Sequence, residues 1–140
     1  MKETDIKKVI KYWRATAEHD YETMLGLFRI KRYSDSLFYG HIVLEKILKA
    51  HVVKKTKKEA PKIHNLIKLL ELACLEIGEE EKDLLDLVTG FNIRSRYPDY
   101  KLLFYKMYND KKIAKDKLDK IKNLFLKLCQ KLEQKKKLEK

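Results

Sequence analysis

Apolar residues recur every three or four positions along most of the 140-residue chain. This spacing puts them on one face of an α-helix, whereas a half-buried strand alternates at every second residue. Five segments show the helical spacing, at residues 4–30, 33–55, 64–77, 79–94 and 110–132. We therefore predict an all-α, antiparallel up-and-down bundle of four to five helices. The bundle is expected to form one domain over residues 1–134, followed by a frayed Lys-rich tail at residues 135–140.

The helical stripes also predict which residues form the core and where helices stop. The expected core residues are Trp13, Leu44, Leu48, Leu70, Leu84, Ile121, Phe125 and Leu128. Pro61 prevents continuation of the second helix, and Gly78 is suited to end the third. Pro98 disfavours helix at the residue before it. Residues 94–110 are the least regular part of the chain and contain four of its eight tyrosines.

Charge is abundant and unevenly distributed. The formal net charge is +12, and residues 111–140 hold twelve Lys but only four acidic residues. Residues 71–86 run the other way, with seven acidic residues and one Lys. Such polarity suits a nucleic-acid or acidic protein partner, but Lys-rich helical faces are also common solvated surfaces, so both interpretations stay open.

The chain shows no sign of membrane insertion or export. It has no apolar run near the ~18 residues that a membrane span needs, and its N-terminus lacks the apolar stretch of a secretory signal. We therefore expect a cytoplasmic protein without a membrane partner.

The usual enzyme motifs are missing from the sequence. There is no Gly-rich phosphate loop, no G-x-S-x-G and no H-E-x-x-H, and Cys74 and Cys129 are not spaced as a metal or redox pair. His41 falls on an apolar stripe, where a hydrogen-bonded core histidine is the expected role. The residues alone therefore predict no cofactor, no metal site and no catalytic set.

Three short motifs, in a fixed order, carry more information. They are E-K-x-x-K-A at residues 45–50, H-x-L at residues 64–66 and S-R-Y-P at residues 95–98. Together with Trp13 and Asp20 in the first helix, they resemble the HEPN family of small helical domains. The resemblance covers about residues 5–132.

The resemblance implies a homodimeric bundle and a choice between two activities. The family includes metal-independent ribonucleases with an Arg, four to six further residues and then a His. No His follows His64, so neither Arg94 nor Arg96 has that partner. The R-Y-P branch resembles domains encoded beside, or fused to, a minimal nucleotidyltransferase. We therefore expect a non-catalytic nucleotide-binding and interaction module, working with such a nucleotidyltransferase in a toxin–antitoxin-like pair.

Under this interpretation the phosphate-binding candidates are Arg94 and Arg96, with Tyr97 as a stacking surface for a nucleotide or RNA base. A structural role is equally open for Arg96, because an Arg near a helix end can bind the free carbonyl groups. The turn at residues 97–98 can simply pack, and the nearby tyrosines suit a dimer interface as well as a ligand surface.

The resemblance also places Glu45, Lys49 and His64 in a groove facing the R-Y-P turn. Glu45 and Lys49 are four residues apart in the order that favours an ion pair on a helix surface, and this is the plainer interpretation of their spacing. His64 can likewise serve only as a contact at the start of the third helix. The alternative function is a metal-independent ribonuclease that uses a displaced histidine, His64, opposite Arg94 or Arg96.

Overall fold

The computed structural model describes residues 1–134, apart from the side chains of residues 94–96 and 99. It contains six helices: α1 (Glu3–Arg29), α2 (Tyr33–Thr56), α3 (Leu66–Leu72), α4 (Glu79–Arg96), α5 (Pro98–Met107) and α6 (Lys111–Glu133). No strand occurs among residues 1–134. The all-α bundle is therefore confirmed, with one helix more than the five segments predicted. The expected tail at residues 135–140 lies outside the described residues.

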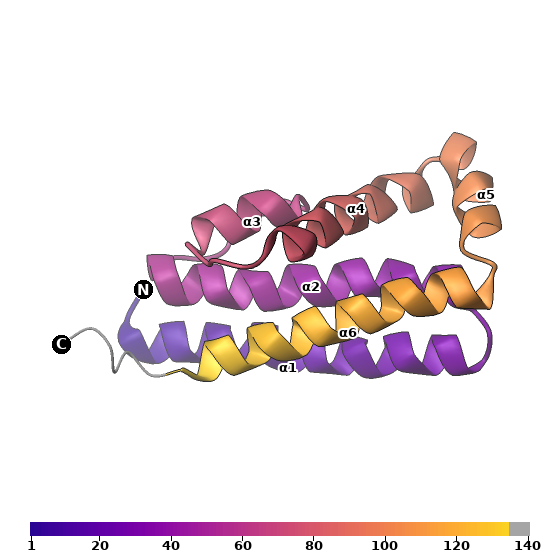
Figure 1. Cartoon of the computed structure of the whole chain (residues 1–140). Coiled ribbons are helices and arrows are strands. Elements are labelled where there is room, and N and C mark those ends of the chain that lie inside the picture. The colour runs from indigo at the N-terminus through magenta and orange to yellow at the C-terminus, as the bar shows by residue number, and fades with distance from the viewer. Residues whose placement is uncertain (135–140) are drawn as a thin grey trace.

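The long helices α1, α2 and α6 lie side by side, and α3 and α4 cover the side of α2 that faces away from α1 (Figure 1). Helix α5 stands at the end of α4 (Figure 1). Helix α2 contacts α1, α3, α4 and α6, which makes it the central element of the bundle. Because α2 is covered on several sides, thirteen of its residues are buried. Side chains on α2 are thus held more firmly than those on a surface helix.

The predicted core is largely confirmed. Seven of its eight members are buried, and only Trp13 is half-buried. The crossing of α2 and α6 depends on Gly40, because a Cβ there would lie 2.7 Å from Cδ1 of Ile121. His41 is also buried, as its place on the apolar stripe predicts. None of the described helices is long and apolar enough to cross a membrane.

The end of α3 differs from the prediction. The helix stops at Leu72, and Cys74, with φ of 53°, adopts the left-handed conformation that closes it. Gly78 instead precedes α4, where its backbone N–H donates to Oε1 of Glu81 over 2.8 Å. Gly78 has a negative φ of −69°, so its role is to start a helix and not to end one.

Helix α5 lies in the segment expected to be irregular. Tyr97 is extended, as expected for the residue before a proline, so α4 ends at Arg96, two residues past the predicted end of the segment at residue 94. Pro98 then occupies the first turn of α5, where its missing N–H leaves no hydrogen bond unmade. The buried ring of Phe104 holds α5 against α4 through Phe91, with ring centroids 5.3 Å apart.

Candidate functional site

A nearly buried carboxylate joins two helices of the bundle. Glu45 on α2 accepts a hydrogen bond from Nζ of Lys49 over 3.1 Å, and its other oxygen lies 2.8 Å from Nδ1 of His64. Lys49 follows Glu45 by one helical turn, so their contact comes from α2 alone. His64 arrives from the segment before α3. We call the group formed by Glu45, Lys49, His64, His41 and Trp13 the Glu45 cluster.

Exposure divides the members of the Glu45 cluster into two kinds. The side chains of Glu45 and Lys49 are 14% and 7% exposed, whereas that of His64 is 50% exposed. The Lys49 ammonium lies 5.3 Å from the ring centroid of Trp13, in cation–π geometry. Since buried charges need partners, Lys49 neutralises Glu45 from the inner side. Of Glu45, Lys49 and His64, the imidazole of His64 is the side chain that solvent and ligands can reach.

The backbone around His64 is fixed as well as its ring. Nε2 of His41 lies 3.0 Å from the backbone oxygen of His64. In the tautomer that carries its proton on Nε2, His41 donates a hydrogen bond to this oxygen. Two residues later, the backbone N–H of Leu66 donates to Oγ1 of Thr89 on α4 over 3.1 Å. The start of α3 is therefore tied to α2 on one side and to α4 on the other. His64 is held between these two helices.

Two of the predicted site residues cannot be placed by their side chains. The side chains of Arg94 and Arg96 lie outside the described residues, although the backbone of α4 continues through both. They follow Thr89 by five and seven residues, or about 7 and 10 Å along the helix axis. Tyr97, at the junction of α4 and α5, is 57% exposed.

The sequence-based candidates therefore fall into two groups. Glu45, Lys49 and His64 are in direct contact, and Tyr97 lies further along at the end of α4. Sequence reasoning did not assign the supporting contact of Thr89, for which no motif exists. His41 lies four residues before Glu45, and this spacing indicates a contact between the two side chains within one helix. Its place on the apolar stripe instead favoured the interpretation of His41 as a core residue.

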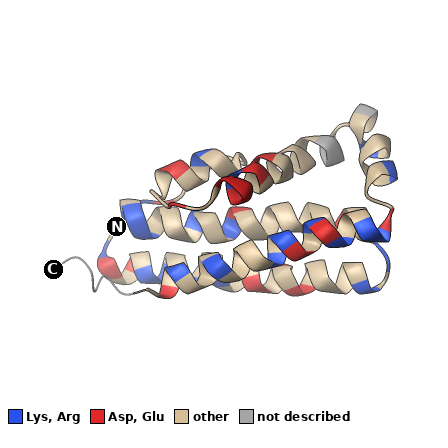
Figure 2. Ribbon diagram, in the orientation of Figure 1, with Lys and Arg blue, Asp and Glu red and all other residues tan. Residues whose placement is uncertain are grey.

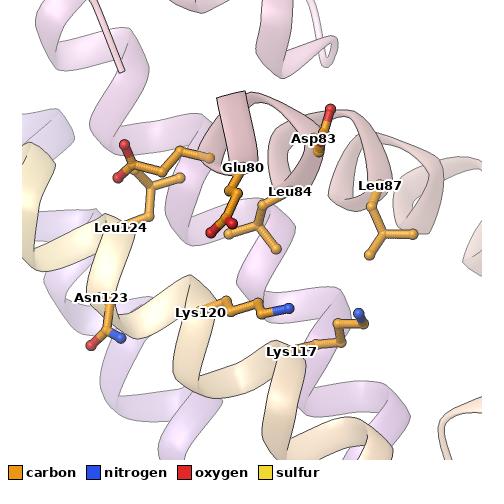
Figure 3. A pocket seen from close by; sticks show the side chains of 9 residues that line it. Glu80, Asp83, Leu84, Leu87, Lys117, Lys120, Asn123 and Leu124 are labelled. Atoms are coloured by element: carbon orange, nitrogen blue, oxygen red, sulfur yellow. The ribbon is translucent and has the colours of Figure 1, made fainter. Parts of the chain in front are cut away.

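A separate cavity of about 460 Å³ opens between α4 and α6 (Figure 3). Glu80 extends from α4 toward α6, while the carboxylate of Asp83 points away from α6, and Lys117 and Lys120 reach from α6 toward Leu84 and Leu87 (Figure 3). The cavity thus combines both signs of charge over an apolar floor, with acidic residues at the start of α4 and lysines along α6 (Figure 2). It does not include the Glu45 cluster, and it gives no preference for an anionic ligand.

The bundle and the Glu45 cluster together define a small all-α domain with a fixed surface histidine. Comparison with protein families gives the class: the sequence model of the HEPN domain matches residues 10–132. The chain therefore belongs to the HEPN domain family. No curated protein and no solved structure matched the sequence.

Proposed function

We propose that this HEPN domain is a non-catalytic module that binds a nucleotide or an RNA phosphate between His64 and the end of α4. The observation that carries the proposal is the fixed, half-exposed imidazole of His64, held by Glu45 over 2.8 Å. Its neighbour α4 ends with Arg94 and Arg96, whose guanidinium groups are the side chains best suited to bind phosphate oxygens in pairs.

Each candidate residue then has a defined role in the proposed site. Arg94 and Arg96 bind phosphate, Tyr97 offers an exposed aromatic face to a base, and His64 donates a hydrogen bond. Lys49 and Glu45 act as positioning residues, because their charged groups are nearly buried and engaged with each other. Neither Arg94 nor Arg96 starts the ribonuclease pattern, since no His follows His64 in the sequence.

RNA titration of matched variants tests this site. Fluorescence anisotropy with a labelled single-stranded RNA decamer should show binding that Arg96→Ala weakens by about 10-fold or more, because a charge-assisted contact is lost. Lys115→Ala removes one exposed charge elsewhere, on α6, and should change the affinity by less than about 2-fold. Equal affinities of the wild type and Arg96→Ala would remove Arg96 from the site.

A second candidate function is a metal-independent ribonuclease, and one observation favours it. A carboxylate at Nδ1, as between Glu45 and His64, is the arrangement that orients a histidine for proton transfer at Nε2. Incubation with RNA in the presence of EDTA separates the two functions. The proposal predicts intact RNA, whereas cleavage that disappears in His64→Ala would establish the ribonuclease.

We further propose that the domain works as a homodimer. Large apolar side chains at the end of α4 and on α5 are exposed: Ile93, Tyr97, Tyr100, Leu102, Leu103 and Met107. Stable interfaces bury about 1,600 Å² in total, and exposed apolar side chains that gather on neighbouring elements are typical of interaction sites. Light scattering at micromolar concentration should give the mass of two chains for the wild type and of one chain for Leu103→Asp. The matched control Leu126→Asp, at an exposed leucine on α6, should stay dimeric, and a monomeric wild type would contradict the proposal.

The expected partner is a minimal nucleotidyltransferase protein, in a toxin–antitoxin-like pair within the cytoplasm. This part of the proposal rests on the resemblance of the R-Y-P segment at residues 95–98. Co-expression with the product of the neighbouring reading frame should yield a stable complex that contains a short nucleotidyltransferase. Purification of the chain without any such protein would count against the pairing.

A further inference from the structure

The turn between α1 and α2 places a lysine where glycine is usual. The backbone N–H groups of Lys31 and Arg32 donate to the carbonyls of Phe28 and Leu27 over 3.0 and 2.8 Å, which is the Schellman arrangement at a helix end. Lys31 takes the left-handed position with φ of 66°. A side chain meets steric resistance there that glycine avoids, and such residues concentrate at functional sites.

This strained turn borders a cavity of about 420 Å³ that we call the turn cavity. The end of α5 reaches the turn and contributes Tyr105 and Lys106, while Lys31, Arg32 and Tyr33 come from the turn itself. The volume falls within the range of small-molecule sites. Two segments that are distant in the sequence thus line an open hollow with room for a nucleotide.

The turn cavity carries an excess of positive charge. Its lining contains Lys31, Arg32 and Lys106 but only one carboxylate, that of Asp35. That carboxylate already pairs with Nε of Arg32 over 3.3 Å. Among the described side chains, no acid lies within ion-pair distance of Lys31 or Lys106. Cations gathered in this way attract an anion, unlike the mixed charges of the cavity between α4 and α6.

The two tyrosines give the turn cavity aromatic walls that are held in place. Tyr33 packs against Phe28 with ring centroids 4.9 Å apart, and Tyr105 packs beside Phe104 at 6.4 Å. Both are partly buried against the core. Their rings can contact a planar base, and their hydroxyl groups can donate hydrogen bonds to phosphate oxygens.

We propose that the turn cavity is a second anion site, which binds a phosphate monoester of the size of a nucleoside monophosphate. Lys31, Arg32 and Lys106 bind the phosphate, and Tyr33 and Tyr105 contact the base. The site shares none of its lining residues with the Glu45 cluster, so it can exist whether or not the proposed site beside His64 binds RNA.

The test uses two lysines in the same backbone conformation. Lys57, at the end of α2, has φ of 61° and does not line the turn cavity. Both Lys31→Gly and Lys57→Gly relieve a left-handed lysine and remove one positive charge. In calorimetric titrations with AMP, Lys31→Gly should weaken binding at the turn cavity by about 10-fold, and Lys57→Gly by less than about 2-fold. Lys106→Gln should act like Lys31→Gly.

Further titrations assign the binding to phosphate and to this site. Adenosine should bind at least about 10-fold more weakly than AMP, because it lacks the phosphate. If the site beside His64 also takes AMP, the wild type binds two molecules per chain, and Lys31→Gly and Arg96→Ala each remove a different one. AMP binding that is lost in Arg96→Ala but unchanged in Lys31→Gly and Lys106→Gln would refute the turn cavity while supporting the proposed function. Absence of AMP binding to the wild type would refute it as well.

Discussion

Two ionic groups of this HEPN domain handle their charges in opposite ways. In the Glu45 cluster, one nearly buried carboxylate binds an ammonium on its inner side and an imidazole on its outer side. In the turn cavity, three exposed cations and one carboxylate line the hollow, and only Arg32 pairs with the carboxylate. The first group satisfies its charges internally and fixes a side chain in place, whereas the second retains positive charge for an external anion. The comparison distinguishes residues that hold a functional side chain in place from residues that bind the ligand themselves.

The largest expected effect comes from opening the Glu45 cluster. Glu45→Leu leaves the Lys49 ammonium nearly buried without its carboxylate, and removing one partner of a buried pair costs about 3 kcal/mol or more. Urea unfolding followed by circular dichroism measures the loss. The double variant Glu45→Leu/Lys49→Met should recover most of it, because no unpaired charge remains. If Glu45→Leu loses less than about 1 kcal/mol of unfolding free energy, the Lys49 ammonium does not depend on Glu45 as its partner.

A smaller effect concerns another buried histidine of the bundle, His51 on α2. Burial lowers its pKa from the ordinary value, aided by Lys54 and Lys131, although its hydrogen bond to the backbone oxygen of Leu128 opposes the shift. The unfolded chain therefore takes up a proton more readily than the folded one. The contribution of neutral His51 to the free energy of unfolding is therefore fully present above the pKa of this histidine in the unfolded chain. It should be lost as the pH falls through the lower pKa of the folded state.

Urea unfolding at pH 7 and pH 5 checks this dependence on His51. His51→Gln keeps an N–H donor for the carbonyl of Leu128, 2.8 Å away in the wild type, but cannot titrate. The variant should lose less stability between the two pH values than the wild type does. Equal losses in both proteins would assign the pH dependence to other groups.

The smallest effect sharpens the contrast at the turn cavity. Lys31→Gly and Lys57→Gly should each raise the free energy of unfolding by about 0.5–1 kcal/mol, because glycine adopts the left-handed conformation without a steric penalty. Thermal unfolding would register a small increase in Tm for both. A clear decrease in the Tm of either variant would mean that the lysine side chain stabilises its turn by more than the left-handed conformation costs.

The fold was predictable because helical spacing recurs in every long segment. Helix α5 was missed since Pro98 indicated a break, whereas a proline in a first turn starts a helix as readily as it prevents one. The end of α3 was misplaced because the left-handed residue is Cys74 and not a glycine. Propensity alone does not reveal such positions.

The site was predictable only in part, and for a similar reason. The contact of Glu45 with Lys49 follows from a spacing of four residues within one helix. Its contact with His64 joins positions nineteen residues apart, and only the resemblance to the HEPN family suggested it. The turn cavity depends on the approach of α5 to the turn before α2, which no local pattern encodes.

The central claim, that RNA phosphate binds beside His64 without being cleaved, can be tested by NMR. Titration of the ¹⁵N-labelled protein with a short single-stranded RNA should perturb the imidazole of His64 and the amides of Leu66, Thr89 and Tyr97 most strongly, while the RNA stays intact. Perturbations confined to the Lys-rich face of α6, with His64 unaffected, would contradict the account.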